Sequence, residues 1–248
     1  MYNSFMSFLK SARAIFSQRA RYFLKGNYHG VSANWLSKNC DSIFGSTFDF
    51  LTSEKIPSRL MLDQLHEGES EYLKAISMRS GVNYGNSFDC EIGLASFLYA
   101  YVLHVKPQVI VETGVANGIT TNVLLAALAK SGGVLHSFDI DPKTANVHPK
   151  SPQWSFHLLE GNTSQALDRI IGKLGKIDLW IHDSNHGFQW QNYEYQLALY
   201  SLSDAGLLVS DDIDSSTAWG LLRHTRHIEK YGIFDTRKMY GVAQFKEW

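Results

Sequence analysis

Carboxylates, glycines and a histidine stand between residues 108 and 212, directly after five apolar runs. The polar groups begin at Glu112, Asp139, Glu160, His182 and Ser210. One acidic residue in such a place is usually only a helix cap. In an open α/β sheet, however, ligands bind beyond the carboxyl ends of the strands. Five polar ends in series therefore predict a binding or catalytic site.

The first group, residues 112–120, favours close approach of a ligand to the backbone. Gly114 and Gly118 lack a Cβ, and a helix that begins after them offers free N–H groups. Asp139 follows Gly114 by 25 positions, a spacing at which a carboxylate binds ribose hydroxyls. The glycine spacing departs from the dinucleotide pattern G-x-G-x-x-G, and Glu112 would repel a pyrophosphate but attract an ammonium group. We therefore expect S-adenosylmethionine rather than a nicotinamide dinucleotide.

Three further carboxylates, Asp183, Asp211 and Asp212, follow two later apolar runs. Oxygen ligands of this kind suit a hard cation such as Mg²⁺, which keeps several waters or substrate oxygens. A divalent cation on a substrate hydroxyl lowers the pKa of that hydroxyl, and positioning then governs an in-line attack. The competing interpretation is that Asp211 or Asp212 only caps a helix over 216–230.

His186 follows Asp183 by three positions, and an imidazole titrates near working pH. We expect His186 to act as a general base or to contact the substrate. A structural role for this lone histidine is the alternative, and Asp183 itself could accept the proton. His182, inside its apolar run, is expected to pack beside the cofactor.

Alternating strands and helices must position these residues. We predict strands at 108–112, 134–139, 154–159, 177–183 and 206–211, helices at 119–131, 163–174, 188–201 and 216–230, and a terminal strand pair near 232–236 and 240–246. Repeated βα units with continuous apolar strands indicate an α/β fold with a doubly wound, mostly parallel, seven-stranded sheet.

The part of the chain before this sheet is expected to be a helical extension or lid, residues 1–88, joined to a cofactor-binding domain, residues 89–248. Apolar residues at helical spacing predict a helix over 90–105. Short helices are expected at 58–65 and 71–78. Residues 26–52 are expected to be irregular, and the loop 80–87 is expected to cover the site.

Charge is unevenly distributed along the 248 residues. The net charge is −1, yet residues 1–40 carry six basic side chains and no acid, so the remaining residues carry −7. This acidic body excludes nucleic-acid binding by charge. Residues 2–24 mix apolar and basic side chains, which fits an amphipathic helix on an anionic membrane surface. A helix packed on its own domain or on a second subunit, or an organellar transit segment, fits the pattern as well.

Other features indicate a cytoplasmic protein. Cys40 and Cys90 are too few for a disulfide framework and are interpreted as reduced thiols. No apolar run reaches the length of about 18 residues that a membrane span needs. The N-terminal residues also lack the features of a secretory signal.

The segment from about 108 to 212 resembles the core of class I S-adenosylmethionine-dependent methyltransferases. It is most similar to the metal-dependent O-methyltransferases, which include macrolide-sugar and catechol enzymes. Residues 112–120 match the first motif of this family, acidic-x-Gly-x-x-x-Gly-x-Ser/Thr, and residues 139–142 match the acidic motif after the second strand. The resemblance covers somewhat under half of the chain.

The resemblance implies a role for each matching residue. Cofactor contacts are implied for Glu112, Gly114 and Gly118 (methionine part), Thr120 (near its carboxylate), Asp139 (ribose), and Gly161 and Asn162 (adenine). The metal ligands would be Asp183, Asp211 and Asp212, because the family has Asp at one strand end and Asp-Asn or Asp-Asp at the next. His186 stands where catechol-type relatives carry a lysine base, and a histidine can take that role.

These inferences predict an O-methyltransferase that acts on a hydroxyl of a small molecule with Mg²⁺ or another divalent cation. A sugar or natural-product glycoside is the first choice of acceptor, and a catechol or phenylpropanoid is the second. We also expect a homo-oligomer, and peripheral membrane contact through the basic N-terminal helix is an open option. The alternatives are a hydroxylase or oxidoreductase-like enzyme on the same fold, and a non-catalytic, membrane-associated binding module.

Overall fold

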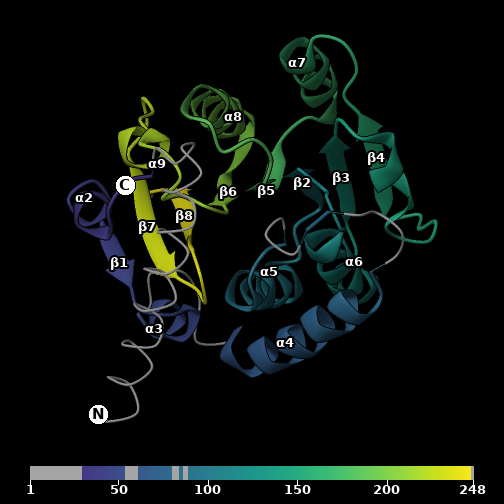
Figure 1. Ribbon diagram of the computed structural model, residues 1–248, viewed down its shortest axis with the longest axis horizontal. Coiled ribbons are helices and arrows are strands. Elements are labelled where there is room, and N and C mark those ends of the chain that lie inside the picture. Colours follow the sequence, from purple (N-terminus) through teal and green to yellow (C-terminus); the bar gives the residue numbers. More distant parts are fainter. Residues whose placement is uncertain (1–29, 54–60, 80–83, 86–88, 247–248) are drawn as a thin grey trace.

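The computed structural model describes residues 30–53, 61–79, 84–85 and 89–246. These residues form an eight-stranded sheet with helices on both faces (Figure 1). The strand order is β1-β7-β8-β6-β5-β2-β3-β4, and β8 runs antiparallel to β6 and β7 while the other pairs are parallel. The strands are Ser42–Phe44 (β1), Val109–Thr113 (β2), Val134–Asp139 (β3), Trp154–Leu158 (β4), Ile177–His182 (β5), Leu202–Ser210 (β6), Ile228–Phe234 (β7) and Met239–Phe245 (β8).

Helices cover the sheet in two layers. Figure 1 shows α4, α5 and α6 on one face of the sheet, and α7 and α8 on the other. The helices are Ala33–Ser37 (α2), Thr47–Thr52 (α3), Leu62–Ser77 (α4), Ile92–Val105 (α5), Ile119–Ser131 (α6), Thr163–Leu174 (α7), Phe188–Ser201 (α8) and Ala218–Leu221 (α9).

The core lies between the sheet and these two layers. Ile110 in β2 and Leu179 in β5 are fully buried, as expected for strands whose two faces are both covered. Helix α5 is buried from Leu94 to Val102 without interruption, which explains why its sequence is apolar on all sides and not along one stripe. Helix α4 covers α5, and Gly68 allows close approach because a Cβ there would come within 2.8 Å of the Ser96 Cα.

The predicted α/β fold with a doubly wound, mostly parallel sheet is confirmed. Helices α6, α7 and α8 and strand β3 have the predicted bounds. All seven predicted strands are present, and β1 adds an eighth that the sequence analysis did not predict. The spacing of apolar residues predicted these strands and helices correctly, because they bury continuous or one-sided apolar surfaces.

The helix predicted over 216–230 is wrong. Helix α9 ends at Leu221, and β7 already begins at Ile228. At Gly220 a Cβ would overlap the ring of Trp35, and Lys230 Nζ donates to the Gly220 carbonyl oxygen at 2.9 Å. Tertiary contacts thus end the helix, and the next residues pair with β8 instead.

The segment predicted to be irregular, residues 26–52, contains α2, β1 and α3 in its described part. Strand β1 pairs in parallel with β7, and Asp41 Oδ2 accepts a hydrogen bond from Lys230 N at 2.6 Å. This strand is only three residues long, so it has no periodicity that could be recognised in the sequence.

The two short helices predicted at 58–65 and 71–78 are also wrong, because α4 is one continuous helix. Gly68, in its middle, is kept in the helix by its packing on α5. The amphipathic helix predicted for residues 2–24 lies outside the described residues, and so does most of the loop 80–87.

Segments on both sides of residue 88 share the sheet, since β1 is paired with β7. The division into an extension and a domain at that residue stays a prediction. Cys40 and Cys90 are both free thiols. None of the described helices is long and apolar enough to cross a membrane.

Candidate active site

The strand order reverses between β2 and β5, because β2 continues to β3 on one side while β5 continues to β6 on the other. Such a reversal opens a crevice at the carboxyl ends of the two strands, where open α/β sheets bind ligands. The loop after β2 contains the two predicted glycines, and the loop after β5 contains Asp183 and His186. The topology therefore places two of the predicted residue groups at the ends of adjacent strands.

The loop after β2 has three residues with positive φ, Gly114 at 88°, Ala116 at 45° and Gly118 at 74°. At Gly114 a Cβ would overlap the carbonyl oxygen of Asp183, and at Gly118 it would overlap Val147. Asp183 N donates to the Thr113 carbonyl oxygen at 2.8 Å, so the two loops also start from paired strands. Only glycine allows the loop to lie this close to the end of β5.

Asp139 holds the shape of this loop. Its Oδ2 accepts hydrogen bonds from Val115 N at 2.8 Å and Ala116 N at 3.2 Å, and its Oδ1 accepts one from Asp141 N at 2.9 Å. Tyr84 in turn donates from its hydroxyl to Asp141 Oδ2 at 2.9 Å. The carboxylate predicted to bind ribose is thus also the group that anchors the glycine loop.

Glu112 is fully buried at the end of β2. Its Oε2 accepts hydrogen bonds from Thr121 Oγ1 at 2.7 Å and Ser137 Oγ at 2.6 Å. Among the described residues, its Oε1 has no hydrogen-bond partner. Burial raises the pKa of Glu112 to about 7. A buried acceptor without a partner beside a glycine loop fits a cationic ligand group, such as the ammonium of an amino acid.

The remaining predicted cofactor residues lie along the same edge of the sheet. Thr120 is buried in the first turn of α6. Gly161 has a φ of 68° and lies just before α7. Asn162 is the N-cap of α7 and accepts hydrogen bonds from Gln165 N at 3.3 Å and Ser164 Oγ at 2.9 Å. The side chain of Asn162 is therefore engaged in capping.

The three predicted metal ligands are grouped around two other side chains. Lys238 Nζ forms ion pairs with Asp211 Oδ2 and, at 3.4 Å, with Asp212 Oδ2. His186 Nε2 lies 3.5 Å from Asp212 Oδ2 and 3.7 Å from Asp183 Oδ1. We call these five residues, Asp183, His186, Asp211, Asp212 and Lys238, the carboxylate cluster.

The carboxylate cluster does not have the geometry of a divalent-metal site. No group of three or more His, Cys, Asp or Glu side chains in the described part of the chain is arranged to hold a metal ion. The ammonium of Lys238 already faces one oxygen each of Asp211 and Asp212. Asp211 and Asp212 also do not cap a long helix, because no helix extends over 216–230.

Ionisation in the carboxylate cluster follows from burial and from this single ammonium. Burial and the charge of Asp211 hold the pKa of Asp183 well above its usual range. Burial raises the pKa of Asp211 to about 7, although the Lys238 charge opposes this shift. Burial acts in the same direction on Asp212, but Lys238 and His186 outweigh it and lower the pKa. Burial lowers the pKa of His186 to about 4, so its ring is neutral at pH 7.

Residues 111–213 match a family model described as Methyltransferase domain. The match begins in β2 and ends just after β6, so it includes the glycine loop, Asp139, Asp183, Asp211 and Asp212. The match covers 103 of the 248 residues, and this segment is similar to methyltransferase domains. The predicted resemblance to class I methyltransferases is thereby confirmed.

Solved structures share the fold of the matched segment and its surroundings. The methyltransferase PaMTH1 from Podospora anserina, solved with S-adenosylhomocysteine, is 12% identical, with 94% of this chain and 96% of that chain covered and a TM-score of 0.55. Cofactor-bound Rv0187 from MTB is 14% identical, with 72% of this chain and 91% of that chain covered and a TM-score of 0.53. The O-methyltransferase TomG from Streptomyces achromogenes, in complex with S-adenosylmethionine, is 11% identical, with 82% of this chain and 97% of that chain covered and a TM-score of 0.50. Such identities show the fold alone, and no curated protein sequence matches.

A buried network beneath the cluster was missed by the sequence analysis. Glu194 of α8 bonds through Oε2 to His182 Nδ1 and to Thr113 Oγ1 at 2.7 Å. Its Oε1 accepts from Trp190 Nε1 at 2.7 Å and from Ser184 Oγ at 3.0 Å. His182, predicted to pack beside the cofactor, is fully buried in this network. The sequence signal that could have indicated this network is Glu194, a carboxylate on the side of the predicted helix that faces the sheet.

The sequence analysis also missed Lys238 and Asn117. Lys238 follows Asp212 by 26 positions and lies directly before β8. Asn117 Nδ2 donates to Asp89 Oδ1 at 2.8 Å and to the Tyr84 carbonyl oxygen at 3.2 Å. These contacts join the glycine loop to the segment that precedes α5, and no local pattern indicates them.

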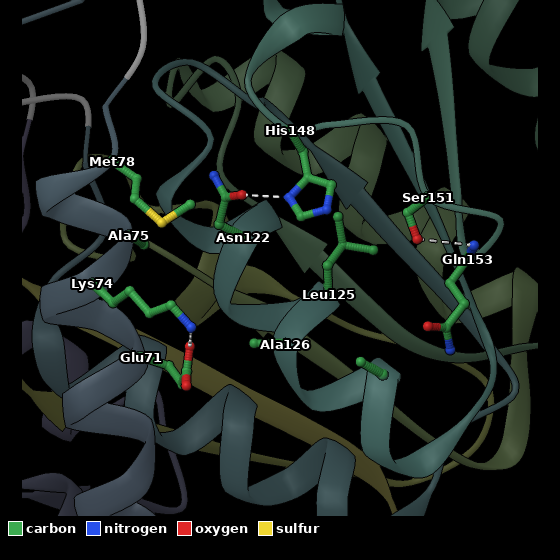
Figure 2. A pocket seen from close by; sticks show the side chains of 11 residues that line it. Glu71, Lys74, Ala75, Met78, Asn122, Leu125, Ala126, His148, Ser151 and Gln153 are labelled. Carbon is green, nitrogen blue, oxygen red and sulfur yellow. Dashed lines mark hydrogen bonds and ion pairs between the residues drawn. The ribbon is translucent and has the colours of Figure 1, made fainter.

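A surface pocket of about 250 Å³ lies between α4 and α6 (Figure 2). Its wall includes Lys74, Met78, Asn122 and His148, and His148 Nδ1 lies 2.6 Å from Asn122 Oδ1. None of the predicted site residues lines this pocket. We therefore assign the candidate active site to the strand ends and not to this hollow.

The raised pKa of Glu112 predicts a pH dependence of ligand binding. If only the ionised carboxylate pairs with the ligand ammonium, affinity for S-adenosylhomocysteine falls about tenfold between pH 8 and pH 6 relative to Glu112→Gln, because a group with pKa of about 7 is mostly protonated at pH 6. The Glu112→Gln variant lacks the titration of Glu112 but keeps that of the ligand and of all other groups, so it serves as the baseline. Calorimetric titration at several pH values measures both proteins, and parallel pH curves would contradict the pairing.

The raised pKa of Glu112 also affects the stability of the chain without ligand. The pKa of Glu112 is higher in the folded chain than its usual 4.5, so this group favours the fold below about pH 4.5 and loses that contribution as the pH rises through about 7. Glu112→Gln is therefore expected to gain stability relative to the wild type between these pH values. Thermal melts at pH 5 and pH 8 measure the change.

Proposed function

We propose that this chain transfers a methyl group from S-adenosylmethionine to a hydroxyl oxygen of a small molecule. The observation that carries the proposal is the contact between the glycine loop after β2 and the end of β5. This contact places a loop suited to a nucleoside-linked amino acid directly beside Asp183 and His186. The proposed cofactor-binding groups and the proposed proton acceptors thus lie at adjacent strand ends, as a methyl transfer to oxygen requires.

The residues around the loop support this cofactor. Glu112 offers a buried oxygen without a protein partner to the ammonium group, and Thr120 lies in the helix turn nearest to the loop. Gly114 and Gly118 keep the loop free of Cβ atoms, while Asp139 anchors it and is proposed to accept from the ribose hydroxyls. Gly161 and Asn162 are proposed to border the adenine. PaMTH1 and TomG, which share the fold, were solved with S-adenosylhomocysteine and S-adenosylmethionine.

The transfer breaks the bond between the sulfonium sulfur and its methyl group, forms a bond between that methyl group and the acceptor oxygen, and leaves S-adenosylhomocysteine. The hydroxyl proton must move to a base. His186 is a candidate because its ring is neutral at pH 7 and can accept a proton. Asp183 is a second candidate in its ionised form, because burial raises its pKa and makes that carboxylate a stronger base. Lys238 competes with a divalent ion for Asp211 and Asp212, so no step of this proposal passes through a metal.

For the acceptor we propose a sugar or natural-product glycoside hydroxyl, with a catechol or phenylpropanoid hydroxyl as the second class. The test incubates purified protein with S-adenosylmethionine and panels of both classes, and detects S-adenosylhomocysteine and the methylated product by mass spectrometry. Methyl transfer without turnover of a nicotinamide cofactor supports the proposal. Nicotinamide turnover without methyl transfer would reject it in favour of an oxidoreductase.

Substitution of Asp139 tests the cofactor site separately from the acceptor. Asp139→Ala is expected to weaken S-adenosylhomocysteine binding at least about tenfold, because it removes a charge-assisted anchor of the loop and the proposed ribose contact. Asp63→Ala, an exposed carboxylate on α4, is the matched control and should bind normally. Calorimetry measures both variants, and an unchanged affinity of Asp139→Ala would reject the assignment.

A further inference from the structure

Lys238 is held in place by the turn between β7 and β8. The turn is closed by Asp235 N, which donates to the Lys238 carbonyl oxygen at 2.9 Å. The carboxylate of Asp235 accepts from Leu94 N at 2.7 Å and Gly93 N at 3.2 Å, which ties the turn to the first residues of α5. The position of the Lys238 backbone is therefore set by the sheet and by α5, and not by the carboxylates that its side chain meets.

The side chain of Lys238 is 8% exposed, and it ends among carboxylates. Its ammonium pairs with Asp211, whose side chain is 1% exposed, and with Asp212 at 3.4 Å. A buried ammonium needs such partners, because transfer from water is otherwise very costly. The same oxygens would have to turn toward a divalent ion if one were bound, since Mg²⁺ requires ligand oxygens at about 2.1 Å.

Asp183 does not contact Lys238 but lies on the side of His186, whose Nε2 is 3.7 Å from Asp183 Oδ1. The three carboxylates thus surround a lysine and a histidine instead of converging on one point. A divalent ion at their centre would lie close to the Lys238 ammonium. Charge repulsion at such a distance would oppose metal binding strongly in a site with little exposure to solvent.

We propose that the Lys238 ammonium is the built-in cation of the carboxylate cluster and takes the place that a divalent metal would occupy. It pairs with both Asp211 and Asp212 and leaves Asp183 and His186 to face the acceptor. This inference rests on the proposed function for its catalytic meaning, but its central claim concerns cation binding by the cluster. The protein therefore binds no divalent metal at these carboxylates as long as Lys238 is present.

The test removes the charge of Lys238 and titrates with Mn²⁺. Wild-type protein saturated with S-adenosylhomocysteine is expected to bind no Mn²⁺ at the cluster, by calorimetry and by electron paramagnetic resonance of free Mn²⁺. Lys238→Met keeps a side chain of similar length without the charge. It is expected to bind one Mn²⁺ with a dissociation constant at least about tenfold below the weakest one that the titration detects, because three carboxylates are then left without a cation. Lys238→Arg keeps the charge and should resemble the wild type.

A second substitution locates the gained metal. Lys238→Met combined with Asp212→Asn is expected to lose the gained affinity, since one of the three carboxylates is gone. Mn²⁺ binding by the wild type with a micromolar dissociation constant that Asp212→Asn weakens would overturn the proposal. Failure of a folded Lys238→Met variant to gain affinity would overturn it too.

If Lys238→Met is unfolded without metal, its thermal melt with Mn²⁺ decides: recovery of a cooperative transition supports the proposal, and no recovery overturns it. Titration of the wild type with S-adenosylhomocysteine alone separates the two claims. Absence of that binding would reject the proposed function, while the Mn²⁺ results would still decide the role of Lys238.

Discussion

Gly114→Ala is expected to destabilise the chain by about 3–5 kcal/mol and to abolish measurable S-adenosylhomocysteine binding. Gly114 has a φ of 88°, which an L-residue adopts only under strain. Its Cβ would overlap the carbonyl oxygen of Asp183 and approach the Ser184 Cα to 2.9 Å. Backbone atoms cannot move aside as a flexible side chain can, so the glycine loop and the end of β5 would have to separate. Urea unfolding and calorimetry measure the two effects.

Gly132→Ala is the matched control for this substitution. Gly132 has a φ of 83°, similar to that of Gly114, but nothing lies within 4 Å of the position of its Cβ. It follows α6, at the opposite end of that helix from the glycine loop. This variant should lose about 1–3 kcal/mol from backbone strain alone and bind the ligand normally. Equal ligand affinity in both variants would mean that the contact with Asp183 does not shape the site.

Glu194→Ala is expected to destabilise the chain by about 3–5 kcal/mol, because it leaves buried polar groups without their common partner. Glu194 is 1% exposed and bonds to side chains from β2, β5 and α8, including Thr113 and His182. Activity should fall as well, since His182 directly precedes Asp183. Gln189→Ala, an exposed position on the same helix, is the control and should change stability by less than about 0.5 kcal/mol. Urea unfolding measures both variants.

The effect of Glu194→Ala should depend on pH. Burial acts to raise the pKa of Glu194, but the charge of His182 and the hydrogen bonds from His182, Thr113 and Ser184 outweigh it and hold the pKa below the usual 4.5. A lowered pKa stabilises the fold above about pH 4.5, and that contribution is lost as the pH falls below this value. The difference in the free energy of unfolding between the wild type and Glu194→Ala should therefore become smaller as the pH falls. A difference that stays constant down to pH 3 would contradict an ionised Glu194.

The bounds of the central elements and the glycine loop were predictable because they depend on local signals. Helix α6 begins directly after Gly118 and ends at Ser131, before two glycines, and these glycines and the apolar residues between them are visible in the sequence. The position of Asp139 relative to the loop was predictable for a related reason. Adjacent parallel strands end at the same edge, so a carboxylate at the end of β3 must lie near the loop after β2.

Partners that are distant in the sequence were not predictable. Trp35 meets Gly220 and ends α9, and this contact joins segments that no periodicity relates. Asp211 and Asp212 looked like metal ligands because their types and their place after β6 suit a hard cation. Which cation they meet is decided by the β7–β8 turn, which brings Lys238 to them.

The sequence by itself therefore determined the α/β fold class, the methyltransferase resemblance and the set of acidic and glycine residues at the strand ends. Those features depend on residue type, spacing and the shared edge of a parallel sheet. Only the tertiary structure decided how the charges are paired, with Glu112 bonded to Thr121 and Ser137, and Lys238 placed between Asp211 and Asp212. The physical reason is that the state of a buried charge depends on its nearest partners in space, and folding chooses these from anywhere in the chain.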